Sequence, residues 1–185
     1  EEVAIDFALD AKRNRNKGAE EAIFETKKGF FDIYGGVNID NVTREMKERN
    51  PGFDGQLHPR LRDDPRVISL ETTDARSLAP DAIIEPPTLL VCDASFIGLA
   101  KLLAVPLSLA APDARLVALF KPQFEVGREN IGKGGIVTDL AATDAAAQAL
   151  TAWLDQAGWA VRAWTDSPIA GGDGNRERLF LAARM

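Results

Sequence analysis

Short apolar runs and polar segments alternate along the chain from residue 59 onward. The runs are rich in β-branched, aromatic and aliphatic residues, and they predict strands at Arg66–Leu70, Thr88–Cys92, Leu116–Phe120, Trp159–Trp164 and Leu179–Ala183. Two longer segments predict helices, at Phe96–Leu109 with a kink near Pro106 and at Asp139–Ala157 closed by Gly158. Continuously apolar strands are typical of a mostly parallel sheet with helices on both faces, so the pattern predicts an α/β fold.

The first 54 residues do not continue this pattern. They contain a polar stretch at residues 11–18 and two short predicted helices, one over Glu20–Lys28 and one from Asp40 or Asn41 to Arg49. No residue pattern in them indicates a chemistry. We therefore expect residues 1–54 to be an unassigned or divergent segment that could complete the sheet, and residues 55–185 to form the main domain.

Composition narrows the class of protein. The chain of 185 residues is 45% hydrophobic and 27% charged, as in ordinary globular domains. It has no apolar run of membrane-spanning length, no leader pattern, and a single cysteine, Cys92, so we expect a soluble cytoplasmic protein without a disulfide. The lone His58 has no second His or Cys nearby, which argues against a metal site. The net charge of −6 means that any RNA contact needs a local basic patch or a region outside this chain.

Two polar side chains stand where predicted strands end. Asp93 follows one strand and Lys121 follows the next, and ligands of parallel sheets collect at the carboxyl ends of the strands. Each residue has a plainer alternative, since Asp93 could cap the next helix and Lys121 could be a surface lysine. Together they indicate a lysine tuned by a carboxylate over a cleft, with Glu177, just before the last strand, as a third member or a solvated charge.

Four sequence blocks carry a more specific signal, because they occur together and in order. The chain resembles the FtsJ-like methyltransferase domain of the TlyA family, often labelled hemolysin, over residues 55–185. The blocks are GQLHPRLR at residues 55–62, DASFI at 93–97, KPQFE at 121–125 and SPIAGGDGNRE at 167–177. The resemblance implies a Rossmann-like class I methyltransferase fold whose last strand is antiparallel.

The resemblance also implies an activity and its residues. It implies S-adenosylmethionine as cofactor and ribosomal RNA, or a ribosomal subunit, as the partner methylated at a ribose 2′-hydroxyl. Three members of the family's Lys-Asp-Lys-Glu catalytic set correspond to Asp93, Lys121 and Glu177. The further residues that it implies are Asp74, Asp93, Ser95 and Phe96 for the cofactor, and Lys133 and Arg176 for the substrate.

Some family features have no clear counterpart in this sequence. The first lysine of the catalytic set is not found, and Gly35-Gly36 is the nearest candidate for the glycine-rich first loop. The acidic residue that grips the cofactor's ribose should fall near Pro51, with Asp54 displaced from that position. An inert methyltransferase-like fold acting as a binding or scaffold module therefore stays open as the alternative. A membrane-lytic hemolysin has little support, since no strongly basic amphipathic helix is present.

Overall fold

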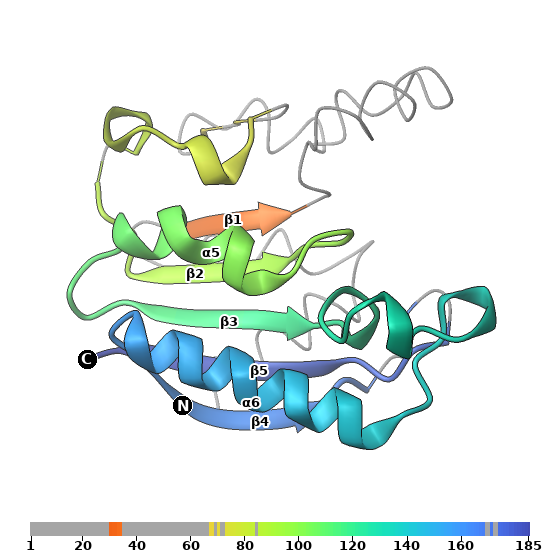
Figure 1. The fold of residues 1–185 in the computed structure, drawn as a ribbon. Helices are drawn as coiled ribbons and strands as arrows, with labels where there is room; N and C mark the ends of the chain where they lie inside the picture. The colour runs from red at the N-terminus through yellow and green to blue at the C-terminus, as the bar shows by residue number, and fades with distance from the viewer. Residues whose placement is uncertain are drawn as a thin grey trace, which may run out of the picture.

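The part of the chain that the structure describes contains a five-stranded sheet (Figure 1). The computed structural model describes residues 67, 68, 70, 73–83, 85–168, 171 and 174–185, and the backbone of residues 30–34. The strand order is β1-β2-β3-β5-β4. The strands are β1 (Phe30–Tyr34), β2 (Leu89–Asp93), β3 (Arg115–Phe120), β4 (Trp159–Asp166) and β5 (Arg178–Arg184).

The strand directions follow the α/β prediction. β1 pairs in parallel with β2, and β2 with β3, while β5 runs antiparallel to both β3 and β4. The expected antiparallel last strand is thereby confirmed. β1 comes from the segment whose role the sequence left unassigned, whereas the two helices predicted there, and Gly35-Gly36, Pro51, Asp54 and His58, lie outside the described residues.

Both described α-helices cover the same face of the sheet (Figure 1). Helix α5 (Leu99–Ser108) and helix α6 (Leu140–Gln156) pack on alternate strand residues that point toward them. These strand residues are Leu90, Cys92, Leu116, Ala118, Phe120, Phe180 and Ala182. The intervening positions of β3 and β5 form a second buried cluster on the opposite face. Helices on that opposite face stay a prediction.

Helix α6 forms where its sequence predicts it. The Asp139 carboxylate caps the helix by accepting a hydrogen bond of 3.0 Å from the Ala142 N–H. The alanine-rich interior favours the helix, and Gly158 follows its end with φ of 81°, a conformation that glycine adopts readily. None of the described helices is long and apolar enough to cross a membrane.

Two local predictions were wrong. Val67, Ile68 and Leu70, the described part of the expected strand Arg66–Leu70, are not in the sheet, because a short run of β-forming residues becomes a strand only where neighbours pair with it. Helix α5 begins at Leu99 instead of Phe96, because Phe96 has φ of 67° and cannot continue a helix.

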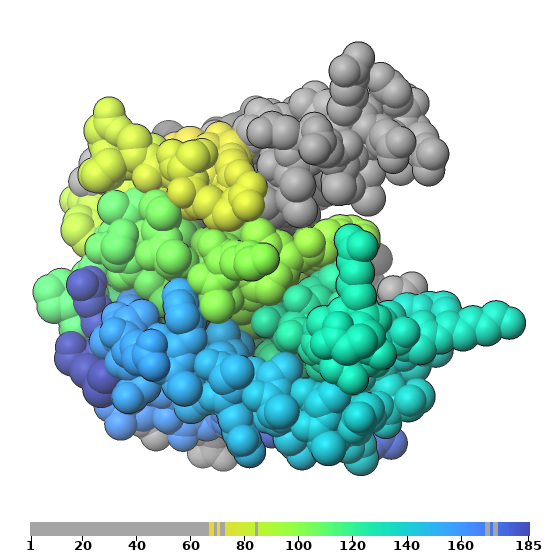
Figure 2. All heavy atoms as spheres, viewed as in Figure 1, coloured from red at the N-terminus to blue at the C-terminus, as the bar shows by residue number. Residues whose placement is uncertain are grey.

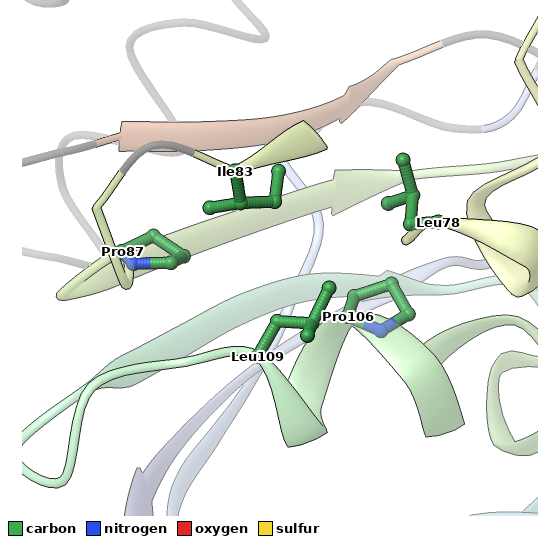
Figure 3. Close-up of a pocket in the computed structure, with 5 residues that line it drawn as sticks. All are labelled: Leu78, Ile83, Pro87, Pro106 and Leu109. Carbon is green, nitrogen blue, oxygen red and sulfur yellow. The ribbon is translucent and has the colours of Figure 1, made fainter. Parts of the chain in front are cut away.

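The segment before β2 contains two short 3₁₀ helices, η1 (Ala75–Ser77) and η2 (Pro80–Ala82), of which η1 packs against α5. Figure 3 shows Leu78, Ile83 and Pro87 of this segment facing Pro106 and Leu109 at the end of α5. The gap that they line has no room for a water molecule. It is therefore a packing contact and not a ligand site.

Candidate active site

Three strands bring the predicted catalytic residues to one edge of the sheet. β2 ends at Asp93, and Lys121 directly follows the end of β3. Phe120 is paired with Arg178 across the antiparallel β3–β5 ladder, so Lys121 and Glu177 lie one step beyond the same pair. β1 ends at this edge too, with Tyr34 opposite Asp93.

Lys121 and Asp93 form the centre of the site. The Lys121 Nζ lies 2.6 Å from the Asp93 Oδ1 in a salt bridge, and it donates a hydrogen bond of 3.0 Å to the Ser95 Oγ. The two side chains are 12% and 20% exposed. Such a short, partly enclosed ion pair is stronger than a surface pair.

The plainer alternatives for these two residues do not hold. Helix α5 begins well beyond Asp93, and its first N–H is accepted by a different side chain, so Asp93 is not its N-cap. Lys121 is mostly enclosed and holds a defined geometry, unlike a surface lysine. The convergence of Asp93 and Lys121 that the sequence predicted is therefore confirmed.

Glu177 is buried at the same edge, beside a glycine that leaves room for it. A Cβ on Gly171 would lie 2.8 Å from the Glu177 Oε1, closer than real Cβ contacts, so a larger residue at position 171 would displace the carboxylate. The backbone carbonyl of Glu177 accepts a hydrogen bond of 2.8 Å from the Ser167 N–H. Glu177 is thus a fixed, enclosed carboxylate and not a solvated charge.

Asn175 holds the loop that carries Glu177, and sequence reasoning missed it. Its buried amide accepts a hydrogen bond from the Val137 N–H and donates one to the Gly135 carbonyl, both at 2.9 Å. These bonds join the loop before α6 to the loop before β5. An asparagine in a glycine-rich loop is common in turns, so the sequence offered no signal for this role.

Glu125 is the second residue that sequence reasoning missed. Its Oε1 accepts a hydrogen bond of 2.8 Å from the Leu99 N–H at the start of α5. Burial raises the pKa of this carboxyl from 4.5 to about 7, against the opposing effect of the Leu99 hydrogen bond. Glu125 belongs to the KPQFE block, which could have indicated it, but only Lys121 was predicted from that block.

The remaining predicted residues differ in their surroundings. The Asp74 carboxylate caps η1 and forms an ion pair of 2.6 Å with Arg76, whose hydrogen bonds lower the pKa of Asp74. The Phe96 side chain is 56% exposed, with its ring centroid 5.2 Å from that of Phe124. Lys133 and Arg176 are exposed. Their roles toward cofactor or substrate stay predictions.

The space-filling view shows how the site's edge is shaped. In Figure 2, the connection from β3 to α6 (residues 121–139, teal) projects beside the chain that follows β2 (green). In the described ranges, no group of three or more His, Cys, Asp or Glu side chains could hold a metal ion. The polar side chains gathered at the site are those of a lysine, two carboxylates and a hydroxyl, namely Lys121, Asp93, Glu177 and Ser95.

Comparisons with known proteins place the chain in a family. Residues 52–184 match the model of a family described as FtsJ-like methyltransferase. The Mycobacterium tuberculosis protein named 16S/23S rRNA (cytidine-2'-O)-methyltransferase TlyA is 43% identical over 181 residues, which are 98% of this chain and 63% of that protein. The likeness therefore extends into the first 54 residues. The Campylobacter jejuni protein named 23S rRNA (cytidine-2'-O)-methyltransferase TlyA is 36% identical, covering 82% of this chain and 56% of its own length.

A solved structure is similar over most of the chain. The structure named "Putative hemolysin from Streptococcus thermophilus" superposes with a TM-score of 0.73 at 28% identity, covering 96% of this chain and 66% of that one. The chain spans 63% and 56% of the length of the two curated relatives named above. The RNA substrates given in the names of those longer proteins are properties of those proteins.

Proposed function

Because this chain belongs to the FtsJ-like methyltransferase family, we propose that it transfers a methyl group from S-adenosylmethionine to a ribose 2′-hydroxyl of ribosomal RNA. The observation that carries the proposal is the enclosed Lys121–Asp93 pair, with Ser95 on the same ammonium, at the carboxyl edge of the parallel strands. The names of the similar proteins supply the substrate class. A ribosomal substrate would place the activity in the cytoplasm.

The reaction makes few demands on the protein's own residues. S-adenosylmethionine supplies a methyl group that is already electrophilic on its sulfonium, so the protein must orient the hydroxyl and help remove its proton. We assign Lys121 to the 2′-oxygen, where its ammonium would stabilise the developing negative charge, or its free amine would accept the proton. Asp93 would orient Lys121 through the 2.6 Å contact. We assign the buried Glu177 as the third charged residue of the site.

The residues at this edge fit the cofactor. Asp93 is a partly open carboxylate at the end of a parallel strand, suited to the positive charges at the methionine end of the cofactor. Gly35-Gly36 directly follow β1 in the sequence, and the last residue of β1 lies opposite Asp93. We propose that this glycine pair allows close backbone approach to the cofactor, although it lies outside the described residues.

The proposed RNA contacts lie on the loops around the site. Lys133 and Arg176 are exposed on the two loops that Asn175 joins. A chain with a net charge of −6 needs such local cations to contact phosphates. We therefore propose them as substrate contacts that set the orientation of the RNA and not its sequence.

Lys121→Ala tests the mechanism directly. With ribosomal RNA and radiolabelled S-adenosylmethionine, we expect methyl transfer to fall about 100-fold or more, as when a residue that assists proton removal is lost. Lys101→Ala removes an exposed lysine on α5 and should leave the rate unchanged. Calorimetric titration should show that Lys121→Ala still binds the cofactor.

The other outcomes are equally informative. Full activity in Lys121→Ala would remove Lys121 from the mechanism. A wild-type chain that gives no heat with S-adenosylmethionine and no methyl transfer would favour the inert fold instead.

A further inference from the structure

Helix α5 is capped from a distant part of the chain. Its N-cap residue, Gly98, has no capping side chain, and the Leu99 N–H donates its hydrogen bond to Glu125, 26 residues later. The other carboxylate oxygen of Glu125 packs against Gly98, 3.4 Å from where a Cβ would lie. Glu125 therefore binds the start of α5 to the connection that follows β3.

The same two segments also meet at the catalytic pair. Lys121 contacts Asp93 and Ser95, and Phe124 packs on Phe96 with ring centroids 5.2 Å apart. Lys121 and Glu125 thus lie at the two ends of one short segment, each attached to the segment from Asp93 to Leu99. Ser95 and Phe96 lie between these attachments and cannot shift without straining one of them.

The backbone between the attachments is itself strained. Phe96 has φ of 67°, a conformation that bulky residues adopt only when the surrounding structure enforces it. If the start of α5 were released, Phe96 could relax toward ordinary φ values. Ser95, its neighbour, would then move away from the Lys121 ammonium.

The surroundings of Glu125 argue against an ordinary surface cap. Burial raises the pKa of Glu125 to about 7, which means that keeping this carboxylate charged inside the fold lowers the stability of the folded chain. Lys121 is paired with Asp93, while Lys101 in the first turn of α5, and Arg128 and Glu129 in the following turn, are exposed. The Leu99 N–H and the positive end of the α5 dipole are what stabilise the charged form.

We propose that Glu125 is a positioning residue, which holds the start of α5 against the Lys121 segment and thereby keeps Ser95 in reach of the Lys121 ammonium. The effect of Glu125 on catalysis rests on the proposed methyl transfer. The attachment itself is a property of the fold and can be measured without substrate.

The Leu99 amide reports on the attachment by NMR. In the wild-type chain, its proton resonance should shift as Glu125 ionises near neutral pH, and Glu125→Gln should abolish that shift. Glu129→Gln removes an exposed carboxylate from the same connection and should leave the shift unchanged. A Leu99 resonance that ignores pH in the wild type, or responds equally in Glu125→Gln, would overturn the proposal.

Methyl-transfer kinetics then test the consequence for the site. Glu125→Ala should lower kcat/KM about tenfold, because small displacements of reacting groups slow a reaction strongly. Glu125→Gln should restore most of the loss, since its amide oxygen can still accept the Leu99 N–H. Equal losses in both variants, or none in Glu125→Ala, would contradict a positioning role. If the wild-type chain transfers no methyl group, the proposed function fails, while the Leu99 titration still decides the attachment.

Discussion

Two cation–carboxylate clusters on either side of β5 use similar charges in different surroundings. At the site, the Lys121 Nζ lies 2.6 Å from Asp93, and both side chains are largely enclosed. At the outer side, Arg178 lies 3.4 Å from Asp144 and 3.9 Å from Asp166, whose side chains are 67% and 94% exposed. Coulomb attraction grows as distance and dielectric fall, so the enclosed Lys121–Asp93 pair is expected to be stronger than the exposed pairs of Arg178.

The surroundings of Arg178 explain why its cluster is weak. Its guanidinium lies 4.8 Å from the Trp164 ring centroid, and the Arg178 side chain is 28% exposed, so its partners carry most of the exposure. Both residues line an open groove of about 590 Å³ between α6 and β4. Water and salt therefore reach these charges and screen them.

Asp93→Asn should produce the largest effect. It leaves the enclosed Lys121 ammonium without its carboxylate, and we expect a loss of about 2 kcal/mol in unfolding free energy, between the values for surface and buried pairs. Methyl transfer should fall about 100-fold as well, because Lys121 loses its orientation. Urea denaturation and the radiolabel assay measure the two effects. A variant as stable and active as the wild type would show that the Lys121–Asp93 pair contributes as little as the exposed Arg178–Asp144 pair.

Glu125→Gln should change how stability depends on pH. As pH rises from 4.5 to about 7, the unfolded chain loses the Glu125 proton while the folded chain keeps it, so Glu125 increasingly destabilises the fold across this window and constantly above it. Glutamine carries no such penalty, so the variant should gain roughly 1–3 kcal/mol relative to the wild type by about pH 8.

Urea denaturation at several pH values provides the measurement for this change. Glu129→Gln is the matched control, since its carboxylate is exposed and should give parallel pH profiles. A constant difference between Glu125→Gln and the wild type from pH 4.5 to 7 would show that burial does not perturb Glu125 in the folded chain.

Asp144→Asn should have the smallest effect. Its ion pair with Arg178 is long and exposed, so we expect less than about 0.5 kcal/mol in unfolding free energy. The effect should fall further when salt is added. A loss of unfolding free energy as large as that of Asp93→Asn would mean that the groove shields the Arg178 and Asp144 charges from water.

The residues of the site could be predicted because strand ends are visible in the sequence. Asp93 and Lys121 each follow an apolar run, and parallel strands bring such positions to one edge. The same reasoning failed at Arg66–Leu70, whose described residues lie outside the sheet. A strand needs partners, and the sequence of one run does not contain them.

The sequence by itself determined the α/β pattern, the extent of α6 and the residues at the strand ends, because periodicity, capping and apolar runs act over neighbouring positions. Only the tertiary structure decided which side chain starts α5, and that Asn175 joins two loops. Those bonds connect residues 26 to 40 positions apart, and their hydrogen-bond partners are backbone groups that every sequence carries. A side chain bonds to whichever backbone group lies beside it in the folded chain, and the local sequence does not encode that position.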